Sequence, residues 1–168
     1  MKKIMYIFLF IVTIFFLSSC DEIKVASKKG VYINEVCSNN ASTIYTLDYQ
    51  YYDWIELYNS TDETINLKNY GLSDNKSKLF KFSFPAIKIE ARKYLIVYFN
   101  PDKEDKANLI AGFGISSSGE ELYLSMPNGS VLDSIKVPKL EEDTTYGRYL
   151  KGGQYTWDVL NPTPLEKN

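Results

Sequence analysis

The sequence predicts an all-β domain of the sandwich class, which follows an N-terminal export signal. Two observations support this fold class. From residue 31 onward the chain is a succession of short runs rich in β-branched and aromatic residues, separated by Gly, Pro and Asn. No segment after residue 20 repeats its apolar residues with the helical period of about 3.6 residues. Many short strands without helices are typical of a sandwich rather than an α/β fold.

Residues 1–19 are predicted to be a signal peptide. Lys2 and Lys3 precede an apolar run over residues 4–17, which only Thr13 interrupts. A helix of that length covers about 21 Å, short of the ~30 Å hydrocarbon core of a bilayer. A basic head before such a run indicates a signal peptide rather than a transmembrane helix.

The residues that end this segment, Leu17-Ser18-Ser19-Cys20, resemble the lipobox of bacterial lipoproteins. The resemblance implies that Cys20 receives a diacylglyceryl group and becomes the mature N-terminus after cleavage. Two or three acyl chains anchor a protein stably, whereas one chain holds only marginally. We therefore expect an exported protein that is lipid-anchored to a membrane of the bacterial cell envelope. The polar residues 20–30 are expected to be its tether.

The first strands of the domain are expected soon after the tether. Each is a short run that alternates apolar with polar residues or is continuously apolar, and each ends in a turn-forming residue such as Asn59. In chain order they are expected at residues 31–37, 53–58, 65–67 and 70–73.

The middle of the domain carries the most apolar segments. Phe80, Phe82 and Phe84 alternate along a strand expected at residues 79–84, and we expect them to line one inward face. A short strand is expected at 87–89. Residues 94–99, YLIVYF, are almost continuously apolar and are expected to form a central strand buried on both faces.

The last third of the chain is expected to begin with a hairpin. Residues 121–125 and 131–137 flank a Pro127-Asn128-Gly129 turn. Two short strands then follow, and Pro162-Thr163-Pro164 closes a domain that spans residues 31–164, with 165–168 as a C-terminal tail. The two final strands are expected at residues 146–150 and 155–159.

Composition excludes several classes of function. Cleavage after residue 19 leaves 17 of the 19 basic residues beside 21 acidic ones, a net charge of −4, which argues against nucleic-acid binding. The chain has no His, which excludes Ser-His-Asp and Cys-His catalysis and zinc sites that use histidine. Cys37 is then the one free cysteine of the mature chain, and we expect it to be a small buried hydrophobe.

No cofactor is expected either. A calcium loop of the DxDxDG type is missing from the sequence. Asp53, Asp74 and Asp133 could contribute oxygen ligands, but they are expected to be solvated turn residues rather than a metal site.

The order of the motifs from residue 31 to residue 164 resembles that of the lamin tail domain. This family has an immunoglobulin-like β-sandwich and also occurs in bacterial secreted proteins, so the resemblance implies that fold. The motifs that carry it are Tyr32-Ile-Asn-Glu-Val36, Asp53-Trp-Ile-Glu-Leu-Tyr-Asn59, Ile65-Asn-Leu67, Tyr70-Gly-Leu-Ser-Asp74, Phe84-Pro85, Lys93-Tyr-Leu-Ile-Val97, Ser118-Gly-Glu-Glu-Leu-Tyr-Leu124, Gly129-Ser-Val-Leu-Asp133, Tyr146-Gly-Arg148 and Pro162-Thr-Pro164.

Two glutamates are candidates for a buried ion pair. Glu35 and Glu56 lie inside expected strands, where glutamate is disfavoured. An unpaired carboxylate on a buried face costs several kcal/mol, so each needs a partner. Arg148 is the candidate, because its guanidinium could bridge to one or both carboxylates. This interpretation is structural, and a catalytic carboxylate pair is not expected because nothing indicates a cleft.

The loop at residues 38–52 is the candidate binding site. It departs from the lamin tail pattern by its length, and it carries Tyr45, Tyr49, Tyr51 and Tyr52. Tyrosine-rich loops make contact surfaces at a low cost in entropy, for protein or for sugar. Packing of these rings onto their own sandwich is an equal alternative.

We therefore expect a non-catalytic, membrane-anchored interaction or adhesion module that binds a protein partner of the cell envelope. One alternative is the binding of a carbohydrate or envelope polymer through the tyrosine-rich loop. Another is an accessory domain of a secreted nuclease or phosphatase system, because bacterial relatives of the lamin tail domain often sit beside such enzymes. The absence of a second domain in this sequence weakens the last alternative.

Overall fold

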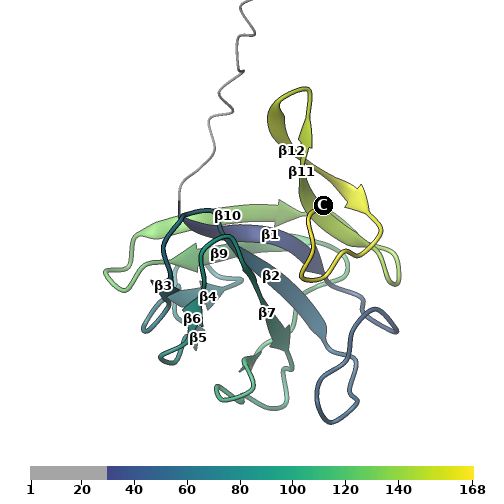
Figure 1. Ribbon diagram of the computed structural model, residues 1–168. Coiled ribbons are helices and arrows are strands. Elements are labelled where there is room, and N and C mark those ends of the chain that lie inside the picture. The colour runs from purple at the N-terminus through teal and green to yellow at the C-terminus, as the bar shows by residue number, and fades with distance from the viewer. Residues whose placement is uncertain (1–29) are drawn as a thin grey trace, which may run out of the picture.

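The computed structural model describes residues 30–168, so the signal peptide, Cys20 and most of the tether lie outside the described residues. The described part consists of twelve strands and contains no helix (Figure 1). These strands form two main sheets and one two-stranded ribbon. The prediction of an all-β, immunoglobulin-like sandwich is confirmed.

The larger sheet has six strands in the order β12-β11-β1-β2-β7-β8. Its pairs are antiparallel except for β7 and β8, which run parallel. The bounds of its strands are Val31–Cys37 for β1, Asp53–Asn59 for β2, Tyr94–Phe99 for β7, Ile110–Ala111 for β8, Thr145–Lys151 for β11 and Gln154–Leu160 for β12.

The smaller sheet has the order β10-β9-β4-β5, and β3 pairs with β6 as a separate ribbon. The core lies between the two sheets because alternate residues of each strand face the other sheet. Ile55, Leu57 and Val97 of the larger sheet and Leu72 and Leu122 of the smaller one are fully buried in it. The bounds are Ile65–Asn66 for β3, Gly71–Ser73 for β4, Phe82–Ser83 for β5, Lys88–Ile89 for β6, Glu120–Ser125 for β9 and Val131–Val137 for β10.

Two expectations about the middle of the domain are corrected. Phe82 and Phe84 are buried and pack edge to face, but Phe80 is 43% exposed. The reason is that β5 begins only at Phe82, so strand alternation does not govern Phe80. The strand β7 is not buried throughout, because its second neighbour β8 covers only Tyr98 and Phe99.

A β-bulge in β1 shapes the outer face of the six-stranded sheet, the face turned away from the core. The register to β2 shifts so that Ile33 pairs with Leu57 and Glu35 pairs with Glu56, which leaves Asn34 as the extra residue. A bulge of this kind sets two residues of one strand against one residue of its partner. Asn34 and Glu35 therefore both stand opposite Glu56.

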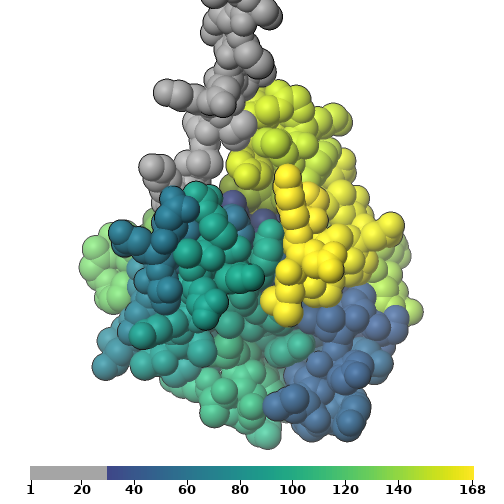
Figure 2. Space-filling view, viewed as in Figure 1, coloured from purple at the N-terminus to yellow at the C-terminus, as the bar shows by residue number. Residues whose placement is uncertain are grey.

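The C-terminal segment, residues 161–168, folds back over this outer face (Figure 2, yellow). Asn168 Nδ2 lies 3.3 Å from the carbonyl oxygens of both Asn34 and Arg148. A Cβ atom on Gly147 would come within 2.7 Å of Asn168 Nδ2, so glycine lets the segment approach β11 closely. The residues expected to form a tail at 165–168 are thus packed against the domain.

Candidate binding surface

The loop at residues 38–52 connects β1 to β2 and is held in shape by its own polar side chains. Asn40 Nδ2 donates hydrogen bonds to the carbonyl oxygens of Ile44 (2.8 Å) and Tyr52 (2.7 Å). Asp143 Oδ1, from the segment before β11, accepts hydrogen bonds from the backbone N–H groups of Ala41 (2.8 Å) and Ser42 (2.9 Å). The base of the loop is therefore fixed from two sides.

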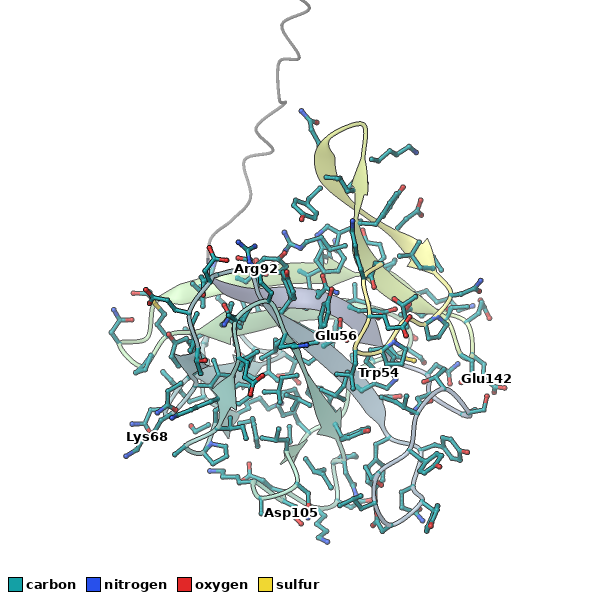
Figure 3. The ribbon with its side chains drawn as sticks, viewed as in Figure 1. Trp54, Glu56, Lys68, Arg92, Asp105 and Glu142 are labelled. Atoms are coloured by element: carbon teal, nitrogen blue, oxygen red, sulfur yellow. The ribbon has the colours of Figure 1, made fainter. Side chains whose placement is uncertain are left out.

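The floor under the loop is the outer face of the six-stranded sheet. Trp54 of β2 is fully buried there, and its indole N–H donates to Thr43 Oγ1 at 3.0 Å. The hydroxyl of Tyr98, on the neighbouring strand β7, donates to the carbonyl oxygen of Tyr45 at 3.3 Å. Figure 3 shows Trp54 below Glu56 along β2, near the end of the strand that carries the loop.

A tight turn orders the tip of the loop. The backbone N–H of Thr46 donates to the carbonyl oxygen of Gln50 at 3.0 Å, and the N–H of Tyr49 donates to the carbonyl oxygen of Thr46 at 2.9 Å. Tyr49 adopts a left-handed backbone with φ of 59°. Because Thr46 is buried and its hydroxyl also lies 3.1 Å from the Gln50 carbonyl oxygen, the turn is anchored from beneath.

This scaffold presents an exposed apolar cluster, which we call the tyrosine surface: Tyr45, Leu47, Tyr49 and Tyr51. Their exposed fractions are 53%, 92%, 76% and 46%. The ring of Tyr45 stacks on Tyr49, with centroids 5.5 Å apart, and meets Tyr51 edge to face at 5.8 Å. Three of the four loop tyrosines predicted as a site are therefore gathered into one exposed cluster.

The fourth predicted tyrosine lies apart from this cluster. Tyr52 is half-buried and precedes β2, with its carbonyl oxygen held by Asn40. Sequence reasoning missed Leu47, the most exposed member of the tyrosine surface. The available signal was an isolated leucine between Thr46 and Asp48, in a loop where no strand alternation could bury it.

A hollow of about 440 Å³ adjoins the tyrosine surface. One wall is formed by residues 45–48, and the other by side chains of the 103–110 segment, including Lys103, Asp105 and Asn108. Hydrogen bonds from the side chain and backbone of Asn108 hold the pKa of Asp105 below its usual value, so its carboxylate is charged. The hollow thus combines aromatic rings with carboxylate, amide and ammonium groups.

The two strand glutamates are fully buried farther along the same outer face. Glu35 Oε1 accepts hydrogen bonds from Thr145 Oγ1 at 2.6 Å and from the backbone N–H of Thr163 at 3.1 Å. Burial raises the pKa of Glu35 above its ordinary value, and these hydrogen bonds oppose the rise. The partners of this carboxylate are thus polar neutral groups.

Glu56 is covered in the same way. Its carboxylate accepts hydrogen bonds from Asn34 Nδ2 at 2.8 Å and from the backbone N–H of Leu165 at 2.5 Å. Burial raises the pKa of Glu56 to about 7, and the adjacent carboxylate of Glu35 adds to the rise. Both glutamates are held by the C-terminal segment and serve to fix it against the sheet.

The predicted ion pair of Arg148 with Glu35 and Glu56 is wrong. Arg148 Nη2 lies 3.1 Å from Asp133 Oδ2 instead. The reason is strand alternation: Thr145 and Gly147 of β11 face Glu35, so the next side chain, Arg148, points away from Glu35. It lies between Asp133 of β10 and the ring of Tyr32.

Asp133 is therefore not the solvated turn residue that was expected. It is 5% exposed, and besides Arg148 it accepts a hydrogen bond from the backbone N–H of Ile33 at 2.9 Å. The carboxylate joins β10 of one sheet to β1 of the other and closes the edge of the sandwich. The sequence signal for this role is an aspartate in the middle of a predicted strand.

The cysteine of the described residues is covered. Cys37 is fully buried, as predicted, and burial raises the pKa of its thiol to about 12, which keeps it protonated. Among residues 30–168, no three Cys, Asp or Glu side chains gather closely enough to hold a metal ion. Within that same range, no helix is long and apolar enough to cross a membrane.

Comparison with known proteins identifies a family. The family model described as Lamin Tail Domain matches residues 24–139, which covers β1 to β10. A search of curated proteins finds no match for this chain. The matched range contains the tyrosine surface, whereas β11, β12 and the C-terminal segment lie beyond it.

Proposed function

The chain belongs to the lamin tail domain family, and from that premise we propose that it is a non-catalytic interaction module of the bacterial cell envelope. A lipid on Cys20 holds it at a membrane, and the tyrosine surface binds a protein partner. Lamin tail domains are β-sandwich modules without a catalytic centre of their own, which makes a binding role the natural one for a chain of this kind.

One observation carries this proposal: four large apolar side chains of a single loop are exposed together while the backbone beneath them is fixed. Isolated exposed apolar residues are common on proteins, but contiguous apolar patches mark interaction sites. Rings that are already stacked lose little side-chain entropy on binding, which is why tyrosine is favoured in contact surfaces. Tyr45 and Tyr49 thus form a preorganised contact pair, and Leu47 is exposed on the same loop.

The position of the loop supports the same proposal. The described chain begins at Gly30, immediately before β1, and the loop follows the other end of that strand. Seven residues of strand span about 23 Å. Figure 1 shows the loop at residues 38–52 at the opposite end of the domain from the start of β1. With an anchor on Cys20, the start of β1 would be the end of the domain nearest the anchor, and the tyrosine surface would lie at the opposite end.

A photo-crosslinking residue at position 47 tests the proposal in the intact envelope, with the full lipidated chain. We expect a specific protein adduct, which the double substitution Tyr45→Ala and Tyr49→Ala reduces at least tenfold. A crosslinker at position 80 is the matched control, because Phe80 is also exposed (43%) but lies outside the tyrosine surface. The same adducts from both positions would contradict the proposal.

The anchor has its own test. Labelled fatty acid fed to growing cells should be incorporated into the wild-type protein, and Cys20→Ala should abolish the incorporation, because no other residue in the motif accepts a diacylglyceryl group. Label that persists in Cys20→Ala would rule out this site of attachment.

A saccharide is the second candidate ligand, and the hollow beside Tyr45 favours it. Sugar rings pack on aromatic faces, and their hydroxyl groups bond to carboxylate and amide side chains such as Asp105 and Asn108. Binding of the detergent-solubilised protein to a glycan array, lost on Asp105→Ala together with Tyr45→Ala, would select this candidate. A crosslinked protein with an empty array would select the first.

A further inference from the structure

A second, smaller hollow lies at the opposite end of the same outer face, and it does not involve the tyrosine surface. Its volume is about 70 Å³. Tyr32, Tyr58 and Tyr94 line it from three adjacent strands, where they are paired in register across β1, β2 and β7. A water molecule takes up about 30 Å³ of liquid, so this volume suits one small oxyanion rather than a sugar or a peptide.

The hollow is lined almost entirely by hydrogen-bond donors. Besides the three strand tyrosines, it receives Tyr155 from β12, Arg148 from β11 and Lys167 from the C-terminal segment. None of the described side chains that line it is acidic. Burial raises the pKa of Tyr32 and raises that of Tyr94 to about 12, so their phenol groups keep the proton that they can donate.

Arg148 is held rigidly at the wall of the hollow. Its guanidinium carbon lies 4.5 Å from the centroid of the Tyr32 ring and 4.9 Å from that of Trp157, and Asp133 fixes one nitrogen at 3.1 Å. A guanidinium has five N–H donors, so one ion pair leaves others available. Its Nε atom is buried and has no hydrogen-bond partner within residues 30–168.

We propose that this hollow binds a phosphate group, either as inorganic phosphate or as part of a phospholipid head group. Fixed arginine, a lysine and several phenols supply charge-assisted and neutral donors from different directions, which matches the tetrahedral set of phosphate oxygens. The proposal is independent of the ligand of the tyrosine surface.

A lipid source is within reach if the proposed anchor is correct. The hollow lies at the end of the sheet where β1 begins, and Gly30 follows Cys20 by ten positions in the chain. An extended chain of that length reaches at most about 36 Å. The phosphate groups of the anchoring membrane could therefore meet the hollow, which would set the orientation of the domain on the bilayer.

Calorimetric titration of inorganic phosphate into the full lipidated protein, purified in a maltoside detergent, tests the site. We expect saturable one-to-one binding that chloride at equal ionic strength does not reproduce. Tyr94→Phe and Lys167→Gln should each weaken the affinity by about three- to tenfold, since each removes one donor. Tyr70→Phe is the matched control and should bind as the wild type does, because Tyr70 lies outside the hollow.

Equal affinity in all four proteins, or no phosphate binding at all, would overturn the proposal. Both substitutions are mild: Tyr94→Phe keeps the ring that packs on Tyr58 at 4.7 Å, and Lys167 is exposed. The source of the phosphate is decided by repeating the titration in phospholipid nanodiscs. A signal lost in the discs assigns the hollow to lipid head groups, and a signal that persists assigns it to free phosphate.

Discussion

Tyrosines at the two ends of the outer sheet face are ordered by different means. Tyr32 and Tyr58 sit opposite each other on paired strands, and their rings meet at 5.5 Å because the register of the sheet brings them together. Tyr45 and Tyr49 stack at the same distance of 5.5 Å, but a hydrogen-bonded loop brings them together. Tyr32 of the first pair is buried beneath Arg148, whereas both rings of the second pair are exposed to solvent.

The difference separates residues that stabilise the fold from residues available for contact. The end of the outer face that carries Tyr32 and Tyr58, which we call the covered end, buries polar groups. A buried polar group without a hydrogen-bond partner lowers the stability of the fold. Asp133 and Glu56 meet that requirement by contacts within the chain, and Arg148 meets it at the nitrogen that pairs with Asp133. The tyrosine surface makes no such demand, because its rings can be removed without leaving a buried group unpaired. Stability measurements can therefore distinguish the two ends.

The largest effect is expected from Arg148→Ala at the covered end. The substitution removes the ion pair with the buried carboxylate of Asp133 and the stacking on Tyr32 and Trp157. Loss of one partner of a buried pair costs about 3–5 kcal/mol in the free energy of unfolding. Chemical denaturation followed by tryptophan fluorescence measures this change.

Arg92→Ala is the matched control for that experiment. Arg92 also pairs with an aspartate, Asp62, but both side chains are exposed, at 55% and 85%. Solvent screens such a pair, so the unfolding midpoint should stay within error of the wild type. Equal effects of Arg92→Ala and Arg148→Ala would contradict the distinction between a covered and an exposed end.

The next effect is a dependence of stability on pH that comes from Glu56. Its pKa in the folded chain is about 7, above the ordinary value of 4.5, so the folded state binds the proton more tightly than the unfolded state. The stabilisation is complete below pH 4.5 and is lost as the pH rises through 7. The loss is on the order of 3 kcal/mol. Glu35 has a raised pKa as well and acts in the same direction.

Unfolding free energies between pH 5 and pH 8 measure this slope. Glu56→Gln should flatten it, because glutamine keeps an acceptor for the Leu165 N–H without titrating. Glu142→Gln, at an exposed position, should leave the slope as it is. If Glu56→Gln and wild-type protein lose stability in parallel over this range, another group controls the pH dependence.

The succession of short apolar runs allowed the sandwich and most of its strands to be predicted from sequence. Ile55 and Leu57 lie in one of these predicted strands, and both are fully buried in the core. The partners of the polar groups could not be predicted in the same way. The sequence predicts an arginine partner for a buried strand carboxylate, and Arg148 does pair with one. Whether Arg148 faces Glu35 or Asp133 depends on the register of its strand, because a shift by one residue turns every side chain to the other face.

The C-terminal segment shows a second limit of the sequence. Its contacts with Glu35 and Glu56 use the backbone N–H groups of Thr163 and Leu165, which every residue except proline possesses. Composition therefore carries no trace of them. The sequence signal was indirect. Two glutamates in buried strands require hydrogen-bond donors for their carboxylates, and backbone N–H groups can supply these donors as well as an arginine can.

The smallest effect on stability is expected from the double substitution Tyr45→Ala and Tyr49→Ala. Both rings are more than half exposed, so their removal returns little apolar surface to water. The backbone hydrogen bonds of the turn do not use these side chains, and Thr46 keeps its place beneath the turn. We expect the free energy of unfolding to change by about 0.5 kcal/mol or less, as at other surface sites. Crosslinking from position 47 should nevertheless fall sharply. A destabilisation as large as that of Arg148→Ala would mean that the tyrosine surface is a structural element, and the proposed contact site would lose its main support.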